Sequence, residues 1–313
     1  MEEVKNRIEL IIDSEQKCNR ETIIENNLEN LFVFDDKNIY YDLLKDKIKD
    51  IKVLNLKDLE NSVSWNLLTY PYYLYKNGDI DNAIELINKI GFYIFNEFNE
   101  NIDMFWTNTS SDYLTALTIH LFEKENDIKK INIANVLELS NEFEKGLLDE
   151  YYNKLDNKSL EYTLISTIIN LPTDTKLSVL AVFNQKMKII SMRPNLSEKL
   201  SNDDINLDKI DLENKEQCII VVGNPNLNTI ANIFINQLYK VLEKDKSKQK
   251  VNIILDSLDR ISKIEELENL LENDSDINLN LIAITKNKEN LINKYGEYTI
   301  SLFKKVVDKQ WLF

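Results

Sequence analysis

The sequence predicts an α/β protein in which two separate chain segments build one parallel sheet and a mainly helical domain is inserted between them. Short apolar runs alternate with helical patterns in the first third, helical spacing fills the middle, and continuous apolar runs return near the end. Runs that are apolar throughout are typical of a parallel sheet with helices on both faces. We expect an α/β domain formed by residues 1–75 and 188–313, and an all-α domain formed by residues 76–187.

The first α/β segment is predicted to contain three strands separated by two helices. Strands joined by helices of about 10 residues indicate βαβ units and therefore a parallel sheet. The expected strands are residues 7–12, 31–34 and 51–55, and the expected helices are residues 22–28 and 40–49.

The middle of the chain shows helical spacing without period-two alternation. Leu114, Leu117 and Leu121 lie at positions i, i+3 and i+7, so they form one apolar stripe on a helix. The predicted helices are residues 80–98, 110–125, 133–152 and 159–171. Aromatic side chains here are expected in packed positions, Phe105 and Trp106 in the core and Tyr70, Tyr72, Tyr73 and Tyr75 between the two domains.

The second α/β segment is predicted to resume the sheet. An apolar strand over residues 218–222 ends at a turn that contains Gly223, and a helix over residues 229–242 follows. Two further apolar strands, residues 251–255 and 280–284, complete the predicted sheet.

Length and composition set the broad class. At 313 residues the chain is long enough for about two domains. Its two cysteines, Cys18 and Cys218, and its single histidine, His120, exclude a disulfide framework, a zinc cluster and a multi-histidine site. No stretch approaches about 18 apolar residues and no signal-peptide pattern begins the chain, so we expect a cytoplasmic protein without a transmembrane segment. His120 is interpreted as a filler on an apolar helix face.

Glycine content and net charge limit the classes of ligand that the chain is expected to bind. The chain has five glycines, no two of them close together, where average usage of about 7% predicts about 22. Its net charge is −15, and it contains four arginines. Because a nucleic-acid binder normally presents a basic face, DNA binding is expected to be weak or absent.

Several short motifs occur in a defined order along the chain. Val53-Leu54-Asn55-Leu56 precedes Trp65-Asn66-Leu67-Leu68, and Asp103-Met104-Phe105-Trp106 precedes the Asp-Tyr-Leu-Thr-Ala-Leu of residues 112–117. Tyr295-Gly296 follows near the end. In sequence and order this series resembles the type IV secretion coupling proteins, the TraG-type ATPases that move DNA and protein substrates in bacterial conjugation. The resemblance implies a RecA-like P-loop NTPase fold for the α/β domain, and an inserted all-α domain that engages the substrate.

The phosphate loop of that family, G-x-x-x-x-G-K-[ST], corresponds to residues 13–20 of this chain. Its glycines let backbone N–H groups wrap the phosphates, its lysine reaches the β- and γ-phosphates, and its hydroxyl binds Mg²⁺. Here Asp13 and Cys18 replace the two glycines, Asn19 replaces the lysine and Arg20 replaces the hydroxyl residue. Since Asp13 also places negative charge beside the expected phosphates, the loop is predicted to be degenerate and to bind no nucleotide.

The strand 251–255 resembles the family's second catalytic strand, Walker B. Asp256 retains the acidic residue that orders Mg²⁺, whereas Ser257 replaces the glutamate that activates the attacking water, and serine lacks the basicity for that role. Residues 35–39 correspond to the family's D-P-K-G-E, and residues 286–287 correspond to its nucleotide-sensing Gln-Ser.

These departures predict a pseudo-ATPase, with no catalytic residues, no cofactor and no bound metal. The expected function is that of a protein-interaction adaptor or substrate receptor in a conjugation or type IV secretion machine. Its expected partners are proteins of that apparatus, including an active coupling ATPase in a hetero-oligomer. Two alternatives stay open: an active coupling ATPase for DNA transfer that uses Lys17, Arg20 or a partner's residues in a non-standard phosphate loop, and a remnant without function.

Overall fold

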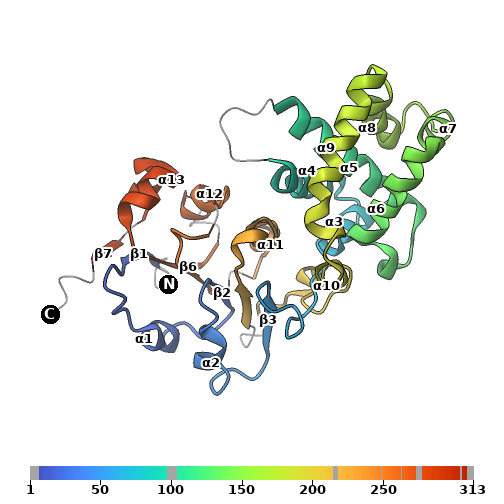
Figure 1. Cartoon of the computed structure of the whole chain (residues 1–313). Helices are drawn as coiled ribbons and strands as arrows, with labels where there is room; N and C mark the ends of the chain where they lie inside the picture. The colour runs from blue at the N-terminus through green and yellow to red at the C-terminus, as the bar shows by residue number, and fades with distance from the viewer. Residues whose placement is uncertain are drawn as a thin grey trace. The chain divides into compact units, whose positions relative to one another are not determined.

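The chain folds into two compact units, described here from a computed structural model. The structure describes residues 7–96, 104–213, 218–247, 249–261, 263–272, 277–303 and 305–308. Residues 1–63 and 209–313 form the α/β unit, and residues 64–208 form the helical unit. Figure 1 shows the strands gathered in the first and helices alone in the second.

The unit boundaries differ from the predicted ones, which placed residues 64–75 and 188–208 in the α/β domain. Backbone hydrogen bonds explain the difference. The Trp65 amide donates to the Lys199 carbonyl at 2.8 Å, and the Asp204 amide donates to the Ser64 carbonyl at 3.0 Å. The chain entering the helical unit is therefore paired with the chain leaving it.

The α/β unit is built on a sheet of seven parallel strands in the order β3-β4-β2-β5-β6-β1-β7. Both chain segments contribute strands to it, so the predicted assembly from two segments is confirmed. The strands are β1 (Arg7–Ile12), β2 (Leu31–Asp35), β3 (Ile51–Asn55), β4 (Cys218–Val222), β5 (Val251–Asp256), β6 (Leu279–Thr285) and β7 (Lys305–Asp308).

Helices cover both faces of this sheet, which is why its central strands are buried throughout and mainly apolar. Every residue of β2, β4, β5 and β6 is buried. Figure 1 shows α1 and α2 on one face and α11, α12 and α13 on the other. The bounds are α1 (Arg20–Glu25), α2 (Tyr40–Leu44), α11 (Asn228–Lys244), α12 (Leu267–Glu272) and α13 (Lys288–Ser301).

The register of the sheet brings several strand ends together. Ile12 of β1 pairs with Thr285 of β6, while Asp256 of β5 pairs with Asp35 of β2. Because all strands are parallel, the segments that leave β1, β2, β5 and β6 emerge at the same edge of the sheet. Segments separated by more than 200 residues in the chain meet there.

The helical unit is organised around α5, a 21-residue helix whose side chains are buried over most of its length. The predicted stripe is confirmed, since Leu114, Leu117 and Leu121 are all buried. Its helices are α3 (Thr69–Lys76), α4 (Ile80–Phe95), α5 (Met104–Lys124), α6 (Ile133–Glu142), α7 (Leu148–Tyr152), α8 (Leu160–Ile169), α9 (Thr173–Ser191) and α10 (Pro194–Lys199).

Helices α4 and α5 cross at close range, and a glycine makes this possible. A Cβ atom placed on Gly91 of α4 would lie 2.2 Å from the Ser111 hydroxyl oxygen of α5. The Thr115 hydroxyl of α5 donates to the Asn88 side chain at 2.6 Å. The crossing thus combines tight backbone packing with a polar contact.

One aromatic prediction in this unit needs correction. Phe105 is 39% exposed, because it lies in the first turn of α5, before the helix enters the core. Tyr72 and Tyr75 of α3 pack against Phe122 of α5, with ring centroids 5.1 and 5.6 Å apart. These two ring contacts join α3 to α5 within the helical unit. Asp103, which precedes Phe105 in the motif, lies outside the described residues.

The helix predicted over residues 133–152 is interrupted, and His120 has polar partners. A π-helical turn over Phe143–Leu147 separates α6 from α7. His120 is buried as expected, but its Nδ1 contacts the Tyr151 hydroxyl and the Glu161 carboxylate. The imidazole therefore links α5 to α7 and α8, so the interpretation as an apolar filler is wrong.

Candidate functional site

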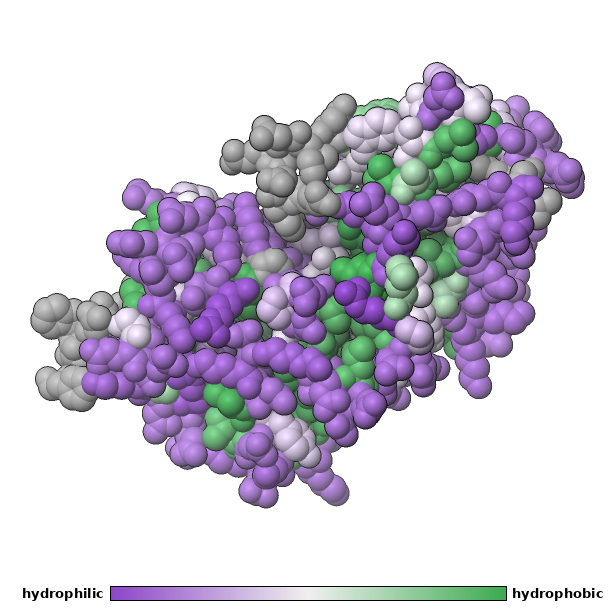
Figure 2. Space-filling model, in the orientation of Figure 1, coloured by the Kyte–Doolittle hydropathy of each residue, from purple (hydrophilic) through white to green (hydrophobic). Residues whose placement is uncertain are grey.

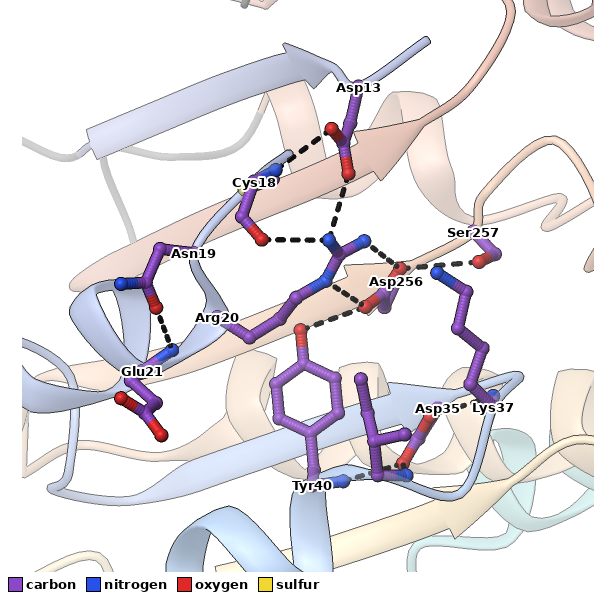
Figure 3. A network of polar contacts seen from close by, with 11 residues as sticks. Asp13, Cys18, Asn19, Arg20, Glu21, Asp35, Lys37, Tyr40, Asp256 and Ser257 are labelled. Atoms are coloured by element: carbon purple, nitrogen blue, oxygen red, sulfur yellow. Dashed lines mark hydrogen bonds and ion pairs between the residues drawn. The ribbon is translucent and has the colours of Figure 1, made fainter. Parts of the chain in front are cut away.

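The segment that follows β1 meets the end of β5 at the carboxyl edge of the sheet, and this is where the predicted site residues lie (Figure 3). The backbone amide of Asp13 donates to the Thr285 carbonyl at 2.7 Å, which extends the pairing of β1 with β6 by one residue. Asp13 and Asp256 are both buried, with 2% and 1% of their surface exposed. Two carboxylates are thus buried in the interior of the α/β unit, at the ends of β1 and β5.

The loop from Asp13 to Arg20 is closed by its own side chains. One oxygen of the Asp13 carboxylate accepts the backbone N–H of Cys18 at 2.9 Å, and the other accepts Nη1 of Arg20 at 2.8 Å. Nη1 also donates to the Cys18 carbonyl at 2.9 Å. The Asn19 side chain accepts the N–H groups of Glu21 and Thr22 and caps α1. Within the loop, the backbone N–H groups of Asp13, Gln16 and Cys18 are therefore bound by acceptors of the chain itself.

The Arg20 guanidinium forms the centre of the site. Its Nε donates to one oxygen of Asp256 at 3.0 Å, and its Nη2 donates to the other at 3.3 Å. Because the same group binds Asp13, it bridges β1 to β5 across β6. Burial alone lowers the pKa of Arg20, but the hydrogen bonds and charge of Asp256, with the Asp13 contact, outweigh it and raise that pKa. Arg20 therefore carries a permanent positive charge.

Two hydroxyl groups complete the surroundings of Asp256. The Tyr40 hydroxyl donates at 3.1 Å and the Ser257 hydroxyl at 3.2 Å. Burial, followed by the nearby charge of Asp256, raises the pKa of Tyr40 well above its usual value, so the phenol stays protonated. Ser257 has a φ of 66°, in the left-handed region that disfavours side chains. Its backbone is held there by the turn that leaves β5.

Asp35, at the end of β2, organises the next loop. Its carboxylate accepts the backbone N–H groups of Lys37, Ile39 and Tyr40 at 2.6–2.9 Å. Burial raises the pKa of Asp35, while these three N–H groups oppose the rise. The Asp that the sequence resemblance singled out thus shapes the loop that positions Tyr40.

Other predicted residues lie apart from this network. Lys17 forms an ion pair with its neighbour Glu15 at 2.5 Å and is more than half exposed. The Lys286 backbone N–H donates to Asp259, and Asn287 caps α13. The residues predicted for the phosphate loop and the second catalytic strand, Asp13, Cys18, Asn19, Arg20, Asp256 and Ser257, are the ones that the fold brings together.

The sequence does not reveal the role of Tyr40 or the double ion pair of Arg20. Tyr40 is predicted only as the first residue of a helix, and no local pattern distinguishes it. Arg20 carries a recognisable signal, because it is one of four arginines and lies in a loop that also contains an acidic residue, Asp13. A buried guanidinium needs such carboxylate partners.

The fold is that of an α/β protein with a parallel sheet and an inserted helical unit, and sequence comparison identifies the family. The profile of the family "Type IV secretory system Conjugative DNA transfer" matches residues 28–303. The chain therefore belongs to this family. The match begins beyond the loop 13–20, so it does not include the segment in which the phosphate loop would lie.

Solved structures show the same fold. The plasmid coupling protein TrwB in complex with ADP and Mg²⁺ is similar with a TM-score of 0.62 and 11% identity, over 97% of this chain and 70% of that one. A sulphate complex of TrwB lacking its first 70 residues gives 0.63 and 11%, over 96% and 69%. VirB4 of Thermoanaerobacter pseudethanolicus gives 0.56 and 11%, over 96% and 77%. The predicted RecA-like fold is thereby confirmed.

No curated protein matches the chain in sequence. Among the described residues, no helix has the length and apolar character needed to cross a membrane.

A nucleotide with Mg²⁺, which the fold family implies, does not fit the residues at this site. The Asp13 carboxylate takes the Cys18 backbone N–H that a phosphate oxygen would need, and side chains stand at both glycine positions. The Arg20 guanidinium already neutralises Asp256, the acidic residue that a metal would use. Within the described part of the chain, no group of three or more histidine, cysteine or acidic side chains is placed to hold a metal ion.

Proposed function

We propose that this chain is a catalytically inactive homologue of the coupling proteins that acts as a protein-interaction adaptor or substrate receptor in a conjugation or type IV secretion machine. The observation that carries this proposal is the Arg20 guanidinium, bound at once to Asp13 and Asp256. It leaves the Walker B carboxylate engaged, and Ser257 next to it cannot act as a base. Membership of the conjugative DNA transfer family supports a function in a conjugation or type IV secretion machine. The contacts of Arg20 support the loss of ATP hydrolysis.

The alternative, an active coupling ATPase with a non-standard phosphate loop, would need Lys17 or Arg20 to hold the phosphates. Arg20 is committed to two buried carboxylates, and breaking such a pair is costly, at about 3–5 kcal/mol. Lys17 is exposed beside Glu15 and lies on no helix or strand that would fix it. These contacts favour the inactive form.

The proposed partners are proteins of the same apparatus, and we place the chain in the cytoplasm, in a hetero-oligomer with an active coupling ATPase. Figure 2 shows a face covered mostly by hydrophilic residues. With a net charge of −15, that surface favours protein partners with basic patches over DNA. We assign the principal binding surface to the helical unit, where α6 exposes Glu138 and Glu142.

The purified full chain is expected to bind no ATP. A ligand at about 100 times its dissociation constant would add about 2.7 kcal/mol to the free energy of unfolding. We therefore expect an unchanged melting temperature with about 1 mM Mg-ATP, measured by scanning calorimetry. A rise of several degrees that Asp256→Asn abolishes would contradict the proposal and support the active ATPase.

The chain is expected to bind an active coupling ATPase from the same cell. Mixing the two purified proteins should give a complex in size-exclusion chromatography with light scattering. Replacing Glu138 and Glu142 by lysine should weaken this complex about tenfold or more, and leave stability within about 0.5 kcal/mol because both side chains are exposed.

A matched control tests where that partner binds. Glu297→Lys changes an equally exposed carboxylate on α13 of the α/β unit and should leave the complex intact. The assignment to the helical unit is wrong if Glu297→Lys weakens binding and the α6 pair does not. Absence of any complex would argue against the adaptor function itself.

A further inference from the structure

The site holds its own substitutes for a bound anion and a bound cation. The Asp13 carboxylate accepts the backbone N–H of Cys18 within the loop, as an oxygen of an anionic ligand would. The Arg20 guanidinium lies between the Asp13 and Asp256 carboxylates, with 10% of its side chain exposed.

The oxygen atoms around this guanidinium are those that a hard divalent cation prefers. Arg20 contacts carboxylate oxygens of Asp13 and Asp256 and the carbonyl oxygen of Cys18. The Tyr40 and Ser257 hydroxyl groups both donate hydrogen bonds to the Asp256 carboxylate, so their oxygen atoms also lie near the guanidinium. Magnesium and calcium ions are coordinated by carboxylate, carbonyl and hydroxyl oxygens of this kind.

The charge balance shows what the guanidinium does. Without it, two buried carboxylates would face each other with only hydroxyl and amide donors between them. Like charges that face each other in a poorly solvated site repel. A cation between the two carboxylates offsets this repulsion and joins the loop after β1 to the end of β5.

We propose that Arg20 is a built-in counter-ion that holds the β1 loop to β5 in place of a bound divalent cation, so that the α/β unit keeps one conformation without metal or nucleotide. This inference deepens the proposed loss of ATPase activity and rests on it. It predicts a latent cation site, closed by the guanidinium and opened when the guanidinium is removed.

The test is metal rescue of Arg20→Ala in the full chain, followed by the melting temperature. Loss of the counter-ion should lower that temperature by about 5–10 °C. About 10 mM MgCl₂ or CaCl₂ should restore at least about half of the loss, whereas NaCl of equal ionic strength should not. The unmodified chain should change by less than about 1 °C with either salt.

Three further variants make the result specific. Arg20→Ala combined with Asp256→Asn removes one carboxylate and should not be rescued by the divalent cation. Arg193→Ala removes an exposed arginine of the helical unit and should show neither loss nor rescue. Arg20→Gln keeps most of the side-chain volume, and if Arg20→Ala does not fold, it should refold better with the divalent cation than without.

Two outcomes would overturn the counter-ion proposal. One is that no Arg20 variant gains stability or refolding yield from a divalent cation. The other is that the unmodified chain is itself stabilised by Mg²⁺ alone. Neither outcome restores nucleotide binding, which is measured separately with Mg-ATP and the unmodified chain, so failure of the counter-ion proposal can be told apart from failure of the proposed function.

Discussion

Replacing Phe183 by alanine is expected to lower the free energy of unfolding by about 3–5 kcal/mol, because the phenyl ring is fully buried and its removal leaves a cavity. Phe183 lies on α9 and packs against Phe95 of α4 and Tyr113 of α5, with ring centroids 5.4 and 4.9 Å apart. It therefore joins three helices of the helical unit. Urea unfolding followed by circular dichroism measures the loss.

Phe105→Ala serves as the matched control, since it removes the same ring from a partly exposed position in the same unit. Its expected cost is below about 1 kcal/mol, because the ring is 39% exposed and lies at the start of α5. If Phe105→Ala is as destabilising as Phe183→Ala, the first turn of α5 is packed more tightly than the structure shows.

Raising the pH from 9 to 12 is expected to remove about 4 kcal/mol of stability through Cys218 alone. Burial in β4, followed by the charge of Asp50, raises the pKa of the Cys218 thiol from 9.0 to about 12. Above pH 9 the thiol ionises in the unfolded chain but stays protonated in the folded one. The contribution is therefore complete below pH 9 and lost as the pH rises through 12, at about 1.4 kcal/mol for each pKa unit.

The comparison of the unmodified chain with Cys218→Val isolates this contribution from the tyrosines that also ionise in this range. Valine suits a buried strand position and does not titrate. Between pH 8 and 12 the urea midpoint of the unmodified chain should fall further than that of the valine variant, because only the unmodified chain has the thiol to ionise. Parallel curves would mean that the thiol ionises in the folded chain as readily as in the unfolded one.

The sequence by itself determined the strands of the sheet with small errors. Residues 7–12 and 218–222 are strands with the predicted bounds, because their apolar runs are bordered by polar and turn residues. The helical insertion was also predictable, since the stripe of Leu114, Leu117 and Leu121 requires a helix with one buried face. Local periodicity reports such features because each depends on neighbours a few residues away.

The sequence identifies the degenerate loop at residues 13–20, but it does not show that the Arg20 side chain bridges Asp13 and Asp256 there. The replacement of glycine by Asp13 and of the hydroxyl residue by Arg20 is visible in the sequence through the family motif. Arg20 contacts Asp256 because the sheet places β6 between β1 and β5. This strand order brings together residues that are 236 positions apart in the chain. Nothing local to either residue specifies that contact.

Only the tertiary structure decided which aromatic side chains are buried and where the units divide. Phe105 belongs to a family motif, yet its position in the first turn of α5 leaves it partly exposed, whereas Phe183 lies outside every predicted helix and is fully buried. Strand β7 also went unpredicted, because four residues at an edge carry too little pattern. Sequence periodicity shows which side of a helix or strand faces a core, but the burial of a side chain depends on which distant segment packs over it. Arg20 becomes the counter-ion of Asp256 for the same reason, because distant segments bring the two residues together.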